Sequence, residues 1–143
     1  MKALFIVLAA FFTMQTVSAQ SAVFSAEKKS AIVDNLIKAI SSENTGLRTS
    51  GAKILSDLIS ESYLESGDAS KAMIPLLKLL RNGKTEEERL AAAVALYQIG
   101  SPIAIYQLRG VGLFDENKKV ALVCKNLYYT YHTLHGTEYL VSF

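Results

Sequence analysis

The stretch TEEERLAAAVALYQIGSP, residues 85–102, is the part of the chain that decides the fold. Thr85 and Glu88 have the spacing of a capping box, in which each side chain accepts a hydrogen bond from the other residue's backbone amide. Glu86 and Glu87 fall in the first turn of the same predicted helix, where the helix dipole favours negative charge. A helix start keeps carboxylates ionised, whereas acid–base catalysis needs a pKa near neutrality. We therefore interpret the three glutamates as a helix N-terminus.

The same stretch also marks where its helix ends and where the next one begins. Gly100 is a helix stop, and Ser101-Pro102 supplies a cap and a first-turn proline for the following helix. One face of the predicted helix consists of Leu90, Ala93, Val94 and Tyr97. Small side chains beside that face let neighbouring helices approach closely, namely Ala91, Ala92 and Ala95.

Helical periodicity recurs along the chain, and strand patterns are nearly absent, so the sequence predicts an all-α fold. Six helices are predicted, over 26–41, 44–63, 68–82, 85–99, 102–110 and 115–135. They form three pairs, 26–63, 68–99 and 102–135, followed by a tail at 136–143. The apolar stripe of the second helix is Leu47, Gly51, Ile54, Leu55, Leu58 and Ile59. Pro75 lies inside the third helix, where we expect a kink.

Two of these pairs align with each other at a period near 40 residues, which is typical of a repeat array. The alignment places Arg48 over Arg89, Gly51-Ala52 over Ala92-Ala93, and Leu55 over Leu96. The third pair fits more loosely, with a basic residue at Lys118 or Lys119 and small residues at Ala121 and Cys124, and its register stays open.

At this point the chain resembles the HEAT-repeat (armadillo-like) family, in its short bacterial and exported form. The resemblance is carried by AMIPLLKLLRNGKTEEERLAAAVALYQIGSPIAIYQL, residues 72–108, and extends loosely over about 27–131. It implies a short right-handed α-solenoid of about three helical hairpins, and a protein-binding scaffold. It also implies structural roles for Pro75, Arg89 and Arg48. Gly51 departs from the family pattern because an alanine is usual there.

The first 19 residues, MKALFIVLAAFFTMQTVSA, have the pattern of a secretory signal peptide. One lysine precedes an apolar run that is too short to span a bilayer as a helix. Val17-Ser18-Ala19 supplies the small residues of a cleavage site, so we expect a mature chain that begins at Gln20. The alternative is an uncleaved membrane anchor. We expect an exported protein, periplasmic or extracellular, without stable membrane insertion after cleavage.

The charge of the chain is balanced, which argues against nucleic acid or an anionic membrane as partner. Without Lys2, fourteen basic side chains face thirteen acidic ones among the 143 residues. Cys124 is the only cysteine, so an internal disulfide is excluded and packing must hold the fold together.

Cys124, His132 and His135 are the one set of residues that suggests metal or nucleophilic chemistry. On a straight helix, Cys124 and His132 are separated by a rise of roughly 12 Å, too far for a shared ion or a catalytic pair. Phosphate-loop, nucleophile-elbow and zinc-protease motifs do not occur in the sequence. We therefore predict no catalytic residue, no metal and no cofactor.

Four of the seven tyrosines lie near the C-terminus, namely Tyr128, Tyr129, Tyr131 and Tyr139. The simpler interpretation is that they cover the open end of a repeat array. Tyr129 lies off the apolar stripe, beside Lys125 and Asn126, and is a reasonable contact for a partner.

Our first functional hypothesis is a non-catalytic scaffold that binds another protein through one face formed by the second helices of the pairs. The polar positions expected on that face are Lys53, Asp57, Glu61, Gln98, Lys118, Lys125 and Tyr129. The second hypothesis is a HEAT-like lyase or accessory factor acting on a small molecule, with a polar pocket around Tyr129, His132 and His135. The third is a minimal repeat remnant without a dedicated partner.

Overall fold

The computed structural model describes residues 24–137 of the chain, and every regular element within them is helical. The all-α prediction is therefore confirmed for this part of the chain. The predicted signal peptide at 1–19 lies outside the described residues, as does the last part of the tail, 138–143.

Seven α-helices and one 3₁₀ turn follow one another along residues 24–137. They are α1 (Ala26–Ile40), α2 (Thr45–Ser60), α3 (Ser66–Ala69), the 3₁₀ turn η1 (Ser70–Ala72), α4 (Met73–Asn82), α5 (Glu86–Ile99), α6 (Pro102–Phe114) and α7 (Lys118–Leu134).

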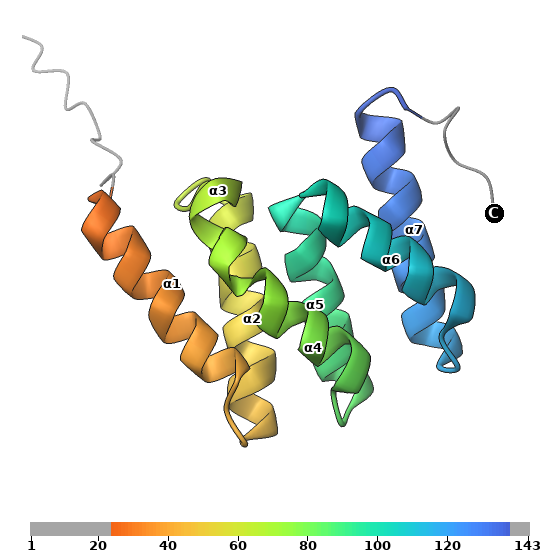
Figure 1. Cartoon of the computed structure of the whole chain (residues 1–143), viewed down its shortest axis with the longest axis horizontal. Helices are drawn as coiled ribbons and strands as arrows, with labels where there is room; N and C mark the ends of the chain where they lie inside the picture. Colours follow the sequence, from red (N-terminus) through yellow and green to blue (C-terminus); the bar gives the residue numbers. More distant parts are fainter. Residues whose placement is uncertain (1–23, 138–143) are drawn as a thin grey trace, which may run out of the picture.

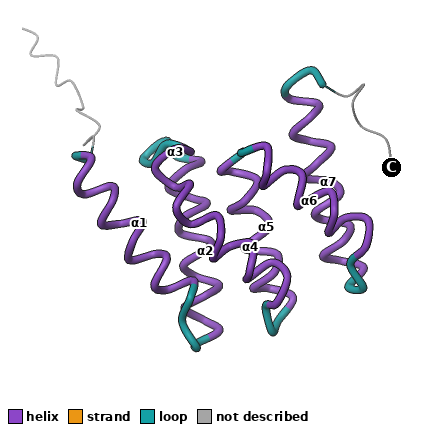
Figure 2. Tube along the Cα trace, in the orientation of Figure 1, coloured by secondary structure: helices purple, strands orange, loops and turns teal. Residues whose placement is uncertain are grey.

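The helices form two layers that run along the long axis of the molecule (Figure 1). One layer holds α1, α4 and α6, and the other holds α2, α5 and α7. Within the second layer, α5 packs against α2 on one side and α7 on the other. Short turns join the two helices of each pair, as the tube in Figure 2 shows. The second helices are therefore neighbours even though loops and first helices separate them in sequence.

The third predicted helix differs from expectation because it is divided into α3, η1 and α4. Pro75 is the third residue of α4 rather than the centre of a continuous helix. The first four amides of a helix have no partner within it, so the missing amide of Pro75 costs no hydrogen bond there. The break comes before the proline, and a mid-helix kink was the wrong expectation.

The fifth helix is longer than predicted, since α6 continues to Phe114 instead of ending at 110. Gly110 and Gly112 lie inside it, and Gly112 lets α6 approach α7 closely. A Cβ on Gly112 would lie 2.9 Å from the backbone nitrogen of Lys125, nearer than real Cβ atoms come. Gly110, the last residue of the predicted helix, therefore lies inside a longer helix that packs closely against α7 at Gly112.

Helix α5 supplies the centre of the core, and it does so through its small side chains. The buried residues of α5 are Glu88, Ala91, Ala92, Ala93, Ala95, Leu96 and Ile99. Alanine side chains occupy little volume, so the neighbouring helices α2, α4, α6 and α7 can all come close to this one helix. The predicted packing face was partly wrong, because Leu90 is only half-buried and Val94 is 37% exposed.

Arg48 connects the first pair of helices to the second. Its Nε donates to Oε1 of Glu88 at 2.8 Å, and its Nη1 donates to the carbonyl of Ser42 at 2.7 Å. Ser42 lies in the turn before α2, and Glu88 lies in the first turn of α5. One guanidinium therefore holds its own turn and the next helix pair at the same time.

Arg89 makes the corresponding contacts one pair further on. Its Nε donates to the carbonyl of Leu80 at 2.7 Å, and its Nη2 pairs with the carboxylate of Asp115 before α7. Each arginine thus contacts a carbonyl of its own pair and a carboxylate of the next pair. The alignment of Arg48 with Arg89 predicted two arginines in equivalent positions, and their contacts are equivalent.

The third pair has alanine where the first two have arginine. Arg48 and Arg89 each follow the N-cap of their helix by four residues, and both donate their amide to the carbonyl of that cap. In α7 the N-cap is Asn117, and the residue that donates to it in the same way is Ala121. Counted from the N-cap, Ala121 therefore occupies in α7 the position that arginine occupies in α2 and α5.

Candidate functional site

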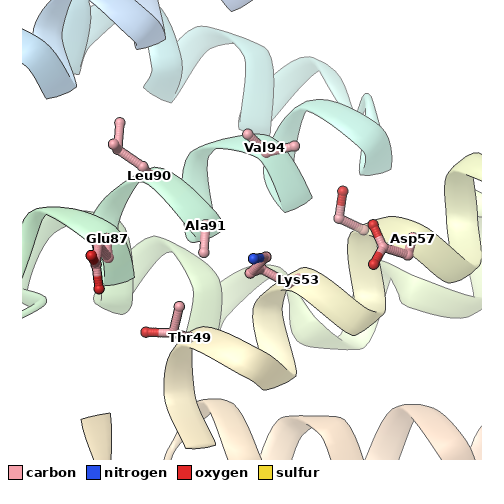
Figure 3. Close-up of a pocket in the computed structure, with 8 residues that line it drawn as sticks. Thr49, Lys53, Asp57, Glu87, Leu90, Ala91 and Val94 are labelled. Carbon is pink, nitrogen blue, oxygen red and sulfur yellow. The ribbon is translucent and has the colours of Figure 1, made fainter. Parts of the chain in front are cut away.

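A groove runs between α2 and α5 on the outer side of the second layer (Figure 3). Its volume is about 540 Å³. We call it the α2/α5 groove, and it is lined by Thr49, Lys53, Ser56, Asp57, Glu87, Leu90, Ala91 and Val94.

The floor and one wall of the α2/α5 groove are largely apolar. Ser56 and Ala91 are buried and small, so they leave room between the two helices. Leu90 and Val94 stand above them on α5 and keep part of their surface in water. A partner that covered this strip would remove apolar surface from solvent.

Three charged side chains border the α2/α5 groove. Figure 3 shows Glu87 and Thr49 at one end, Lys53 near the middle beside Ala91, and Asp57 towards the other end. Lys53, Asp57 and Glu87 are all exposed. Within residues 24–137, none of these three side chains takes part in an ion pair or a hydrogen bond. Their charges are therefore available to a bound molecule.

Glu86, the residue before Glu87, connects α5 to α7 instead. It pairs with Lys119 at 2.7 Å and accepts a hydrogen bond from Asn117 Nδ2 at 3.3 Å. The hydrogen bond from Lys119, together with that from Asn117, holds the pKa of Glu86 below its ordinary value. Glu86 therefore has a structural role.

Glu88, the residue after Glu87, is fully buried beneath Arg48. Its Oε2 accepts from the amides of Lys84 and Thr85, which completes the predicted capping box. Burial alone would raise the pKa of Glu88, but the hydrogen bonds from Arg48 and from the two amides outweigh it, and the pKa is lowered. Of the three adjacent glutamates, only Glu87 is left for contact with a partner.

The structure divides the seven predicted contact residues among different places. Lys53 and Asp57 lie together in the α2/α5 groove. Glu61 is exposed at the C-cap of α2, and Lys118 is exposed as the first residue of α7. Gln98 is half-buried on α5, and its carbonyl accepts a hydrogen bond from Ser66.

Lys125 and Tyr129 form a separate pair on α7. The Lys125 Nζ lies 5.9 Å from the centre of the Tyr129 ring. The backbone of Lys125 abuts Gly112, so this part of α7 faces α6 rather than the α2/α5 groove. Of the seven residues predicted to share one face, only Lys53 and Asp57 line the α2/α5 groove. They do so together with Glu87, Leu90 and Val94, which were not predicted as contacts.

Sequence reasoning missed these three groove residues because it assigned them elsewhere. Glu87 was grouped with two structural acids, and Leu90 and Val94 were assigned to a packing face. The signal that could have found them is the alanine run, since buried alanines on one side of a helix leave its larger apolar residues on the other.

A second cleft, of about 410 Å³, lies between α6 and α7 and is lined by both histidines. His132 Nδ1 lies 2.7 Å from Thr137 Oγ1, and His135 Nδ1 lies 2.6 Å from the carbonyl of Tyr131. Tyr129 does not line this cleft, although the small-molecule hypothesis placed it there. That hypothesis remains a prediction.

Cys124 is fully buried in the core of the third pair. Burial, together with the charge of Asp115, raises the pKa of its thiol to about 12. The thiol is therefore protonated near neutral pH and acts as a small apolar side chain. Across residues 24–137, no three metal-ligating side chains gather into a possible ion site.

Two of the C-terminal tyrosines lie against the core, as the end-covering interpretation predicts for them. Tyr128 is buried, and Tyr131 donates a hydrogen bond to the carbonyl of Gly100 at 3.3 Å. Tyr129 is exposed beside them, and Tyr139 lies outside the described residues.

None of the helices within 24–137 combines the length and the apolar character needed to cross a membrane. The chain matches no family model, no curated protein and no solved structure. Its function must therefore be argued from its own residues.

Proposed function

We propose that this chain is a short HEAT-like α-solenoid that binds another protein through the α2/α5 groove. One observation carries the proposal: an apolar strip is bordered by three charged side chains that form no ion pair and no hydrogen bond within residues 24–137. An apolar centre with a polar rim is the usual composition of a protein–protein interface.

The repeat interpretation is supported by Arg48 and Arg89, which make equivalent contacts one pair apart. It is also supported by the layer of second helices, because stacked hairpins place these helices side by side. Solenoids commonly bind partners along such a layer.

Photocrosslinking in the native host tests the proposed function. A photoreactive amino acid replaces Lys53 in the full-length chain, and the matched control carries it at Lys38, which is exposed on α1 in the other layer. We expect a discrete crosslinked protein from position 53 that is absent from position 38. The purified partner should then bind the chain, and Val94→Ser should weaken that binding.

A crosslinking pattern that is the same from positions 53 and 38 would overturn the proposal. That outcome would favour the third hypothesis, a repeat remnant without a dedicated partner. Ile74→Ser serves as the control for Val94→Ser, because Ile74 is an exposed branched residue on α4.

We also propose that the protein is exported, on the basis of residues 1–19. Sequencing the N-terminus of the mature protein tests this point independently of any partner. A mature chain that begins at Gln20 is expected, and a retained Met1 would contradict export by cleavage.

A further inference from the structure

The length of the α2/α5 groove limits what can occupy it. Thr49 and Asp57 mark its two ends on α2, and their separation of eight residues corresponds to roughly 12 Å along the helix. Two turns of a partner helix cover the same length. An occupant therefore needs only a short segment, with two or three apolar side chains on one face.

The lining of the α2/α5 groove favours a helical occupant over an extended one. An extended segment would place backbone amides and carbonyls against Leu90, Ala91 and Val94, which offer them no side-chain hydrogen bond. Of the two hydroxyls in the lining, that of Thr49 already donates to the carbonyl of Thr45. A helix satisfies its own backbone and presents only side chains to the groove.

The buried small residues give the occupant's apolar side chains a place to enter. Ser56 on α2 and Ala91 on α5 form the floor, and Leu90 and Val94 stand beside it. Side chains of the size of leucine or methionine, spaced by four residues on the partner, would contact both helices.

The charges along the α2/α5 groove alternate in a fixed order. Glu87 is negative at one end, Lys53 is positive near the middle, and Asp57 is negative at the other end. An occupant with complementary charge needs basic, acidic and basic residues in that order, each about one turn from the next. The order is the same from both ends, so it does not fix the direction of the partner helix.

We infer that the segment bound in the α2/α5 groove is a short amphipathic helix with an apolar face bordered by basic, acidic and basic residues at positions i, i+4 and i+8. This inference rests on the proposed function and specifies its partner. The complementary charges steer and orient the helix, and the apolar side chains supply most of the affinity.

Two synthetic helical peptides test the inference. Both carry leucines on one face, and their edges carry either Lys-Glu-Lys or Glu-Lys-Glu at i, i+4 and i+8. The mature protein is labelled with ¹⁵N, and each peptide is titrated while amide shifts are recorded. We expect the Lys-Glu-Lys peptide to bind more tightly, with shifts concentrated around Lys53 and Val94.

Variants of the protein separate charge from apolar contact. The double variant Asp57→Lys/Glu87→Lys should weaken the Lys-Glu-Lys peptide by roughly fivefold for each reversed charge and should strengthen the Glu-Lys-Glu peptide. Glu116→Lys is the matched control, since Glu116 is exposed in the turn before α7, away from the groove. Val94→Ser should weaken both peptides, whereas Ile74→Ser should weaken neither.

Equal binding of the two peptides, tighter binding of Glu-Lys-Glu, or shifts centred outside the groove would overturn the inference. Its failure is distinguishable from failure of the proposed function. If photocrosslinking at position 53 identifies a partner whose bound segment is extended or acidic, the scaffold proposal stands and the helix inference is wrong.

Discussion

Arg48 and Glu88 form an ion pair with almost no access to water, and the pair joins two helix pairs. Removing one member of a buried pair is costly because the other is left charged and unpaired. The carboxylate of Glu88 has two backbone amides as further donors, but Arg48 is its only cationic partner among the described residues. The arrangement makes Arg48 a strong candidate for a stability test.

We predict that Arg48→Met lowers the free energy of unfolding by about 3–5 kcal/mol. Adding Glu88→Gln to it should recover part of that loss, because the glutamine side chain is neutral and still accepts from an amide. Urea denaturation measures both effects, with the exposed substitution Lys53→Met as control, expected to change stability by less than about 0.5 kcal/mol. A cost for Arg48→Met below about 1 kcal/mol, the range of an exposed pair, would contradict the prediction.

The acid side of the pH profile gives a second residue-scale prediction. The pKa values of Glu88 and Asp115 are lowered in the folded chain, because hydrogen bonds from Arg48 and Arg89 outweigh burial. The stability they contribute is therefore fully present above the unfolded pKa values and is lost as pH falls through the folded ones. We expect the free energy of unfolding to fall below about pH 4.5, and Glu88→Gln to flatten that fall. Denaturation midpoints between pH 7 and pH 3 provide the measurement, and a flat profile for the unmodified chain would contradict it.

At the scale of elements, the capping residues predicted correctly where some helices begin. The end of one helix and the buried face of another were predicted wrongly. The starts of α5 and α6 were predictable because Thr85 and Ser101 have local capping signals that the structure contains. The end of α6 was not, because Gly110 is a helix stop only when no neighbouring helix stabilises the chain beyond it. Periodicity alone also could not decide whether the alanines or the larger residues of α5 face the core.

The two glycines of α6 give a matched pair for testing that packing. Gly112→Ala should destabilise the protein by about 1–3 kcal/mol, because its Cβ would press on the backbone of Lys125. Gly110→Ala should instead stabilise it by about 0.5–1 kcal/mol, since a Cβ there meets nothing within 4 Å and alanine favours the helix. Thermal unfolding compares the two variants, and equal shifts in Tm would show that the contact between α6 and α7 is looser than described.

At the scale of the whole molecule, α5 is the central element because it packs against five other helices, α2, α3, α4, α6 and α7. Helix α1 lies at one end of the layer that it forms with α4 and α6. Its exposed side is polar and includes Asp34, Asn35 and Lys38. Elements with few buried contacts open at lower free energy than those at the centre of the core.

We therefore predict that hydrogen exchange is slowest in the middle of α5, around Ala92–Leu96, and faster in α1. The measurement is native-state exchange followed by NMR or mass spectrometry, under conditions in which exchange reports opening equilibria. Equal protection of α1 and α5 would mean that the chain opens only as a single unit, and would contradict the prediction.

Counted from the N-cap, Ala121 of α7 stands where α2 and α5 carry an arginine, so position 121 itself offers no cation to a carboxylate of a further hairpin. This suggests a rule for lengthening the protein by design. An added hairpin would require Ala121→Arg together with an acidic residue at the start of the new second helix, in the place that Glu88 or Asp115 takes now. Conversely, if the middle hairpin were removed, the first and last hairpins could still pack together, provided that the arginine of the first meets an acidic residue of the last. In the proposed repeat, the pairing of an arginine with a carboxylate of the next hairpin is the transferable part of each junction, beside the lysine–carboxylate pairs that also cross it.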